Sequence, residues 1–164
     1  MAEDFTSFTM IEIISYQHKY QPDFKRLNLY WLDKYNLTEA HDLEILDHPE
    51  EKVIAGGGCI FLAMDGDRVV GTAGIAKEQE GIFELVKMGV DPAWHRRGIS
   101  KMLLDCCLDE AKKLKAKKIF LFSNSQLVTA LKLYEKYGFR HVEVTDSPLL
   151  TADVKMELSL SGNP

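Results

Sequence analysis

Hydrophobic and polar positions follow two different periods along the chain, which together predict a mixture of strands and helices. Short alternating or wholly apolar runs predict strands, whereas apolar residues three or four positions apart predict helices. Three strands fill residues 59–90, with a hairpin turn at Asp65 and Gly66. The other predicted elements, in chain order, are a strand at 8–16, helices at 21–35 and 37–49, a helix at 98–114, a strand at 118–123, a helix at 126–139, and strands at 140–145 and 152–160.

Single residues mark where several of these helices begin or end. Pro22 falls in the first turn of the helix at 21–35, where a backbone N–H is not needed. Thr38 is the predicted N-cap of the second helix. Gly138 stands where a helix end favours a residue with a left-handed backbone.

The strand at 82–90, the helix at 98–114 and the strand at 118–123 form a β–α–β unit. Such a unit makes its two strands parallel and joins them by a right-handed crossover. The strands before and after it are joined by short turns, which favour antiparallel pairing. We therefore expect an α/β fold built around a mixed sheet.

Composition narrows the class of protein. A chain of 164 residues fits a single domain over 1–164. The net charge of −5 argues against nucleic acid as the main partner, because phosphate binding needs an excess of Lys and Arg. Three cysteines, two of them adjacent, do not suggest a disulfide framework. The sequence shows neither a signal peptide nor a membrane-spanning run, so we expect a cytoplasmic protein that does not bind membranes.

The turn "GVDPAWHRRGIS" at 89–100 joins a predicted strand to a predicted helix. The first N–H groups of a helix have no partners within it, and the helix dipole adds positive charge there. Gly98 allows close approach of a ligand, and His95, Arg96, Arg97 and Lys101 add cationic donors. The turn therefore suggests a phosphate or pyrophosphate site, and a solvated basic turn is the alternative. Its spacing matches neither a Walker loop nor a dinucleotide-binding glycine motif.

Two segments resemble the GNAT superfamily of N-acetyltransferases. "VDPAWHRRGISKMLL" is similar to the acetyl-CoA-binding motif, and "ALKLYEKYGFR" is similar to the helix end Ala-x-x-x-Tyr-x-x-x-Gly-Phe. This sequence departs from the usual pattern at His95, where Gln or Arg is usual, and at Ser100, where Gly or Ala is usual. Leu127 stands where many members carry Asn, and Asn124 is a candidate substitute.

The resemblance implies a GNAT fold, with a mixed, mostly antiparallel sheet of about seven strands, about four flanking helices and a splayed central parallel pair. It also implies acetyl-CoA as co-substrate, with no metal. By this resemblance, Met88 and Val90 would bond the pantetheine like an added strand, and the backbone N–H of Met88 would bind the oxyanion. The implied cofactor-binding residues are Met88, Val90, His95, Arg96, Arg97, Gly98, Ile99, Ser100, Lys101 and Asn124.

Glu84 is the candidate general base. Strict alternation along the strand at 82–90 would place it on one face with Val86, Met88 and Val90, and not with Lys87. Apolar neighbours raise a carboxyl pKa toward neutrality, which suits a base, and some GNAT members use a glutamate at the matching place. A glutamate that points to water or pairs with a lysine is the alternative, and a bulge would change the face assignment.

Tyr134 is the candidate acid for the leaving thiolate. It shares an apolar helical stripe with Leu127, Ala130 and Leu131, and a purely structural packing role is the alternative. By resemblance, the first two helices and the loop at 145–153 would wall the acceptor site. The aromatic and acidic residues available there are Tyr30, Trp31, Asp42 and Glu44.

The sequence thus predicts an acetyltransferase that moves an acetyl group directly from acetyl-CoA to a primary amine on a small molecule or peptide. The spacing of the histidines suggests no metal site, and the cysteines suit packing better than nucleophilic catalysis. The alternative function is a non-catalytic module that binds or senses acyl-CoA. The sequence is compatible with a homodimer, and it does not identify the amine acceptor.

Overall fold

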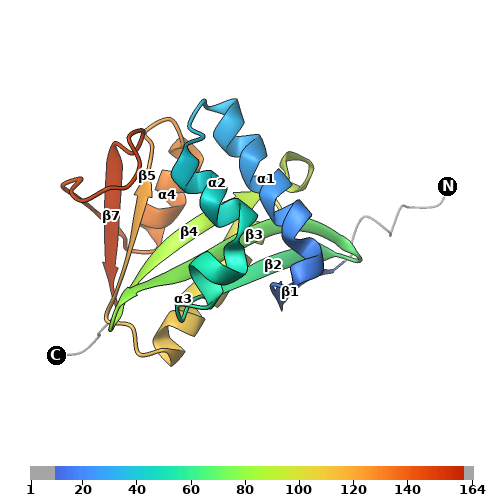
Figure 1. Cartoon of the computed structure of the whole chain (residues 1–164), viewed down its shortest axis with the longest axis horizontal. Coiled ribbons are helices and arrows are strands. Elements are labelled where there is room, and N and C mark those ends of the chain that lie inside the picture. The colour runs from blue at the N-terminus through green and yellow to red at the C-terminus, as the bar shows by residue number, and fades with distance from the viewer. Residues whose placement is uncertain (1–9, 161–164) are drawn as a thin grey trace.

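The computed structural model describes residues 10–160, which form a seven-stranded sheet with helices on both faces (Figure 1). The strands are β1 (Ile11–Ser15), β2 (Cys59–Asp65), β3 (Arg68–Gln79), β4 (Ile82–Val90), β5 (Lys118–Ser123), β6 (Arg140–Val142) and β7 (Val154–Ser159). The α-helices are α1 (Gln21–Lys34), α2 (Ala40–Asp47), α3 (Ile99–Lys113) and α4 (Val128–Lys136). Shorter helical turns are η2 (His18–Tyr20), η3 (Glu50–Ile54) and η4 (Pro92–Trp94).

The strands are arranged in the order β1-β2-β3-β4-β5-β7-β6. β4 and β5 are parallel, and every other neighbouring pair is antiparallel. α3 connects the parallel pair, as the β–α–β pattern predicts. The expected α/β architecture with one parallel pair inside a mostly antiparallel sheet is therefore confirmed.

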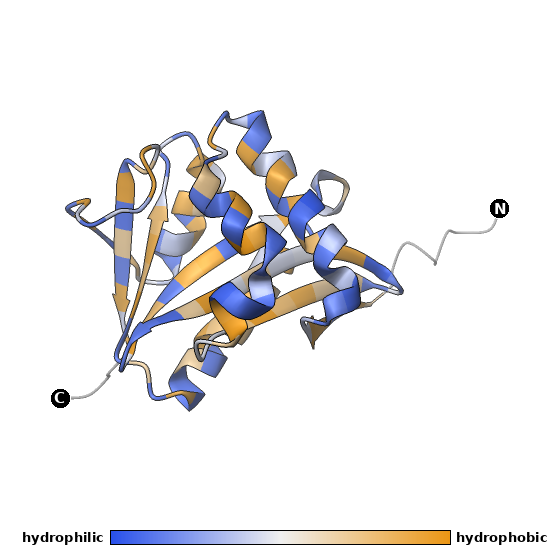
Figure 2. Ribbon diagram, viewed as in Figure 1, coloured by the Kyte–Doolittle hydropathy of each residue, from blue (hydrophilic) through white to orange (hydrophobic). Residues whose placement is uncertain are grey.

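Two hydrophobic cores cover the two faces of the sheet. Residues of α3 and α4 pack on one face, and residues of α1, α2 and η3 pack on the other. Figure 1 shows α1 and α2 in front of β2, β3 and β4, whereas no helix lies in front of β5 and β7 in that view. Figure 2 shows hydrophobic residues along the central strands and hydrophilic residues on the outer sides of the helices.

A β-bulge interrupts β4 at Lys87. Gly74 pairs with Val86 and Thr72 pairs with Gly89, so two residues of β4 lie opposite one residue of β3. Lys87 has the left-handed backbone angle φ 51°, and its carbonyl accepts a 2.8 Å hydrogen bond from the Thr72 hydroxyl. The bulge exchanges the two faces of the strand for every residue that follows it.

The bulge makes part of the predicted face assignment of Glu84 wrong, because Val86 shares its face as predicted but Met88 and Val90 do not. Val86 belongs to the core under α1 and α2, but Met88 and Val90 belong to the core under α3 and α4. Lys87 pairs with Asp42 of α2, so it lies on the same face as Glu84. A bulge depends on the partner strand, which alternation within one strand does not reveal.

Several predicted boundaries also need correction. The second helix is capped by Glu39 rather than Thr38, because the Glu39 N–H donates to Asp42 Oδ2 at 2.9 Å while the Thr38 hydroxyl donates to Asp33. The strand expected at 140–145 has only three residues, and η3 was not expected. Residues 8 and 9 of the first expected strand lie outside the described residues. Within 10–160, no helix is long and apolar enough to span a membrane.

Candidate active site

The turn between β4 and α3 exposes backbone at the start of a long helix. Asp91 begins it by accepting a 2.9 Å hydrogen bond from the Ala93 N–H, and η4 follows. Arg96 and Gly98 have positive φ angles of 65° and 76°, and Gly98 is the N-cap of α3. A Cβ at Gly98 would meet no atom within 4 Å, so the space in front of the helix N-terminus is open. These features fit an anion, as the sequence predicts.

The side chains of this turn differ in their surroundings. His95, Arg96, Arg97 and Lys101 are exposed, Ser100 is half-buried, and Ile99 is buried in the core below α3. Arg97 lies over the ring of Trp94 at 5.8 Å. The exposed cations are therefore available to a phosphate, whereas the Ile99 side chain anchors the helix and can contribute only its backbone.

His95 stacks on Trp31 of α1, with ring centroids 5.1 Å apart and an angle of 5° between the planes. The indole N–H of Trp31 donates to the carbonyl of Val90 at 2.9 Å. Trp31 was expected in the wall of the acceptor site, but it connects α1 to the end of β4 and to the turn. These two contacts of Trp31 therefore hold the His95 imidazole in position. His95 is the residue that stands where the GNAT motif usually has Gln or Arg.

β4 and β5 separate in the middle of the sheet. Only three residue pairs join them, running from Ile82 with Lys118 to Glu84 with Phe120. Beyond Glu84 the two strands diverge, and Met88 lies on the diverging part of β4. This separation is the splayed parallel pair that the resemblance implies. Backbone groups of β4 and β5 face the gap and are available to a ligand.

Glu84 lies at the last residue pair before the gap, on the α1–α2 face. Burial raises the pKa of its carboxyl to about 7, the like charge of Glu78 acts in the same direction, and Lys87 and Lys155 oppose the shift. A carboxyl with this pKa is half ionised near neutral pH, which is what a general base needs. The predicted pKa behaviour is thus reproduced, although Lys87 is one of its neighbours.

Tyr134 lies below the gap, on the opposite face of the sheet. It is 7% exposed, and its hydroxyl lies 4.0 Å from the Met88 sulfur. Burial raises the pKa of the phenol well above its usual range, and Cys107 adds to the shift. The phenol therefore keeps its proton over the whole working range of pH. Tyr137 is different, because its hydroxyl donates to Asp105 at 2.7 Å on the outer side of α3.

Asn124 is already engaged in local hydrogen bonds. Its amide nitrogen donates to the Thr151 carbonyl at 2.8 Å, and its amide oxygen accepts from the Gln126 N–H at 3.0 Å. The side chain thus joins the β5–α4 turn to the loop between β6 and β7. This arrangement does not direct the Asn124 amide toward the gap, so any contact with a pantetheine arm would require its backbone.

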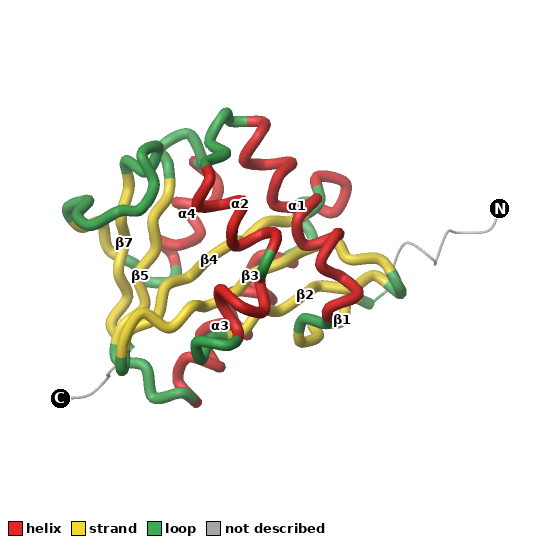
Figure 3. The backbone as a smooth tube through the Cα atoms, viewed as in Figure 1, coloured by secondary structure: helices red, strands yellow, loops and turns green. Residues whose placement is uncertain are grey.

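Glu39 ties the same β6–β7 loop to the start of α2. Its carboxylate accepts hydrogen bonds from the N–H groups of Leu150 and Thr151, at 2.9 and 2.8 Å, and from the Thr151 hydroxyl at 2.6 Å. These hydrogen bonds, the Thr151 hydroxyl first, lower the pKa of Glu39. Figure 3 shows the α1–α2 connection and the β6–β7 loop at the same side of the molecule. Sequence reasoning missed this role, since no local pattern links residues 111 positions apart.

Asp42 was expected among the residues around the acceptor site, but its carboxylate is not free. It is 1% exposed and forms an ion pair with Lys87. Its other oxygen accepts the Glu39 N–H. By contrast, Tyr30 and Glu44 are exposed. Asp42 therefore fixes α2 against the bulge of β4 instead of presenting a charge to a cationic amine.

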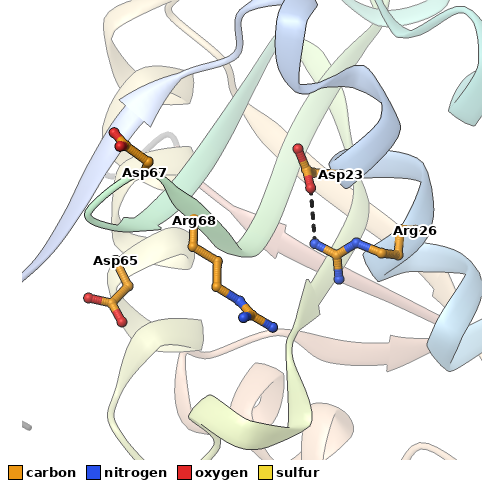
Figure 4. Close-up of a pocket in the computed structure, with 5 residues that line it drawn as sticks. All are labelled: Asp23, Arg26, Asp65, Asp67 and Arg68. Carbon is orange, nitrogen blue, oxygen red and sulfur yellow. Dashed lines mark hydrogen bonds and ion pairs between the residues drawn. The ribbon is translucent and has the colours of Figure 1, made fainter.

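A separate hollow of about 630 Å³ lies beside the β2–β3 hairpin (Figure 4). Asp23, Arg26, Asp65, Asp67 and Arg68 line it. Asp23 pairs with Arg26, so part of the charge is neutralised within the hollow. It does not include any residue of the β4–β5 gap. Within residues 10–160, no group of three or more His, Cys, Asp or Glu side chains is arranged to hold a metal ion.

Comparison with known proteins identifies the family. Residues 19–139 match the model of the acetyltransferase (GNAT) family, and the chain belongs to this family. N-acetylaspartate synthetase of Rattus norvegicus is 35% identical over 106 residues, which are 64% of this chain and 34% of that protein. The chain thus spans about a third of that relative. The uncharacterized N-acetyltransferase YvbK of Bacillus subtilis is 29% identical over 62% of this chain and 68% of its own length.

Solved structures share the fold. A GNAT-family acetyltransferase from Staphylococcus aureus Mu50 aligns with a TM-score of 0.85 and 25% identity, over 92% of this chain and 99% of its own. The PaiA N-acetyltransferase of Thermoplasma acidophilum, crystallised with coenzyme A, aligns with a TM-score of 0.72 and 16% identity over 92% and 99% of the two chains. The predicted GNAT fold is therefore confirmed.

Proposed function

We propose that this protein transfers an acetyl group from acetyl-CoA to a primary amine by direct attack. The observation that carries the proposal is the position of Glu84 and Tyr134 on either side of the β4–β5 gap. Family membership supports acetyl-CoA as the donor, and the names of the matched relatives, N-acetylaspartate synthetase and N-acetyltransferase, support nitrogen as the acceptor atom.

The turn at the start of α3 would hold the pyrophosphate. Arg96, Arg97 and Lys101 supply exposed cations, and the open N-terminus of α3 supplies N–H groups. Backbone groups of β4 around Met88 would bond the arm of the donor, since β4 has no strand partner on the gap side beyond Glu84. When bound, acetyl-CoA supplies a thioester, an acetyl group already activated for attack.

Glu84 would accept a proton from the amine, and Tyr134 would protonate the leaving thiolate or donate a hydrogen bond to it. Glu84, directly or through a water molecule, takes a proton from the amine so that its nitrogen lone pair is free. Tyr134 donates a hydrogen bond or a proton to the departing sulfur. An ammonium acceptor gives one proton to Glu84 before attack and a second proton to solvent after the C–N bond has formed. As the C–S bond breaks, the thiolate gains one proton from Tyr134 or from solvent, and solvent then restores the protonation of both side chains. The net products are an amide, a free thiol and one released proton, and no redox step is needed.

Direct attack is supported by the state of the cysteines. Burial raises the pKa of Cys59 to about 12, and burial also raises the pKa of Cys106 and Cys107. None of the three is therefore a ready thiolate at neutral pH, as an acetylated enzyme intermediate would require.

The experiment is release of free thiol from acetyl-CoA in the presence of a panel of amines, with mass spectrometry of the products. Amine-dependent thiol release with an N-acetylated product supports the proposal. Tight binding of acetyl-CoA without turnover of any amine would contradict it and would favour the binding or sensing module. Exchange of acetyl groups between acetyl-CoA and labelled CoA without an amine would contradict direct attack.

A further inference from the structure

Lys155 of β7 extends across β5 on the α1–α2 face of the sheet. Its Nζ lies 5.3 Å from the ring centroid of Phe120 and 5.3 Å from that of Phe122. The two rings contact each other edge to face, at 5.7 Å. Because β5 lies between β4 and β7, this geometry brings a β7 cation over the strand that borders the gap.

This ammonium group lacks a carboxylate partner among residues 10–160. Two other strand lysines on this face are paired, Lys87 with Asp42 and Lys118 with Glu157. Lys155 is half-buried, and its contacts are with aromatic rings. A cation that is partly removed from water and held over apolar rings attracts an anion more strongly than an exposed surface lysine does.

Lys155 and Glu84 lie within electrostatic range of each other. Lys155 is one of the two cations that lower the pKa of Glu84. In the sheet, Glu84 pairs with Phe120, and Phe120 and Phe122 are the rings below Lys155. No helix lies in front of β5 and β7 in Figure 1, and Glu84, Phe122 and Lys155 are each partly exposed. A negative and a positive group thus share one face beside the gap.

We propose that the amine acceptor carries a carboxylate, and that Lys155 binds this carboxylate while Glu84 receives the amine. The inference rests on the proposed acetyl transfer. A molecule with an amine at one end and a carboxylate at the other matches the two charges in sign and in order. Phe122, whose ring is partly exposed, would contact the carbon atoms between them, whereas Phe120 is buried and contacts the Phe122 ring edge to face. Lys155 would therefore decide which amines bind, without taking part in the chemical step.

The test compares acceptors that differ only in charge. The first pair is an amino acid and its amide, and the second pair is phosphoethanolamine and ethanolamine. Each compound is assayed with the wild type, Lys155→Met and Lys155→Arg. Measurements at pH 9 keep Glu84 ionised in every variant, which separates binding from the effect of Lys155 on the Glu84 pKa. Lys118→Met is the matched control, since it removes a cation of the same face that Glu157 already neutralises.

We expect Lys155→Met to raise the KM for the amino acid about 10- to 100-fold with little change in kcat, the range for loss of a charged contact. The KM for the amide should stay within about twofold, and Lys155→Arg should restore most of the affinity. Equal KM changes for acid and amide, or none, would overturn the inference while leaving acetyl transfer intact. Preference for phosphoethanolamine over the amino acid would replace the carboxylate by a phosphate and overturn the stated class.

Binding in the presence of CoA gives a second, independent measurement. Thermal protection by the amino acid should be present in the wild type and absent in Lys155→Met. If no amine is acetylated but this protection is seen, the proposed function fails and the recognition of carboxylates stands. If amides are acetylated and bound as well as acids by the wild type, the recognition fails and the proposed function stands.

Discussion

Glu84 and Tyr134 lie on opposite faces of one sheet, at the place where β4 and β5 separate. Glu84 belongs to the side of α1 and α2, whereas the Tyr134 hydroxyl lies 4.0 Å from the Met88 sulfur on the side of α3 and α4. The two groups therefore cannot exchange a proton directly. Their contributions to the rate should be separable by mutation.

Glu84→Gln should lower the rate of acetyl transfer about 100-fold at pH 7, the usual scale for loss of a general base. In the wild type, kcat/KM should rise with pH through a midpoint near 7, because the base acts only when it is ionised. The variant should lose this midpoint. Glu78→Gln is the matched control and should keep most of the rate, with the midpoint shifted slightly downward because Glu78 adds to the raised pKa of Glu84. An unchanged pH profile in Glu84→Gln would show that another group takes the proton.

The same substitution should stabilise the fold at high pH. The pKa of Glu84 is about 7 in the folded protein and close to its ordinary value of 4.5 in the unfolded chain. Between these values the folded state binds the extra proton, so the contribution of Glu84 to stability falls as the pH rises through the window. Glu84→Gln should therefore raise the free energy of unfolding at pH 8 by on the order of 1–3 kcal/mol, and by less at pH 5. Equal effects at both pH values in urea denaturation would contradict the burial of the charged carboxylate.

Tyr134→Phe should lower kcat by roughly 10- to 1,000-fold, the span between a lost hydrogen bond and a lost general acid. Only a hydroxyl is removed, so the affinity for CoA should change little. Tyr137→Phe provides the comparison, because its hydroxyl bonds Asp105 and not the residues of the gap. Similar kcat values for the two variants would assign Tyr134 to packing alone.

Gly98→Val should abolish the protection of the fold by CoA. In the wild type, CoA at 100 times its Kd should raise the Tm by about 5–10 °C. Valine at φ 76° is strained by about 1–3 kcal/mol and places its methyl groups in the open space before α3. Gly81→Val controls for this strain, with φ 80° at the far end of β4. Loss of CoA protection in both variants would show that strain, and not the anion site, is responsible.

Glu39→Gln should loosen the loop between β6 and β7. The carboxylate that accepts from Leu150 and Thr151 becomes a weaker, neutral acceptor, so hydrogen exchange at these two amides should speed up about 5- to 10-fold. Because the pKa of Glu39 is lowered, its contribution is complete above its ordinary value of 4.5 and is lost as the pH falls through the folded pKa. Glu44→Gln, on the exposed side of the same helix, should leave both amides unchanged. Equal exchange rates in the two variants would exclude Glu39 as the loop's anchor.

Local periodicity was sufficient to predict the order of the elements. Alternation and helical spacing depend on which side of a segment is buried, and the β–α–β unit around α3 follows from that order. Short runs of sequence were enough to place Gly98 at the start of α3 and Tyr134 on the buried side of α4, because each belongs to one local turn or stripe.

The remaining features depend on contacts between distant segments. The bulge at Lys87 is held by Thr72 of the neighbouring strand, so it reverses the faces of β4 without a local signal. Glu39 displaces Thr38 as the helix cap because its backbone bonds Asp42. Lys155 resembles any solvent-facing lysine of a strand until the neighbouring rings of β5 are placed beneath it.

The sheet consists of two blocks of strands, and only the three residue pairs between β4 and β5 connect them. β1 to β4 form one block, and β5, β7 and β6 form the other. A ligand that bonds both strands within the gap would act as additional rungs of the ladder and would limit bending between the blocks. Glu84 stands on one block and Lys155 on the other. Filling the gap should therefore limit changes in the spacing between them, and we expect the acetyl donor to bind before the amine.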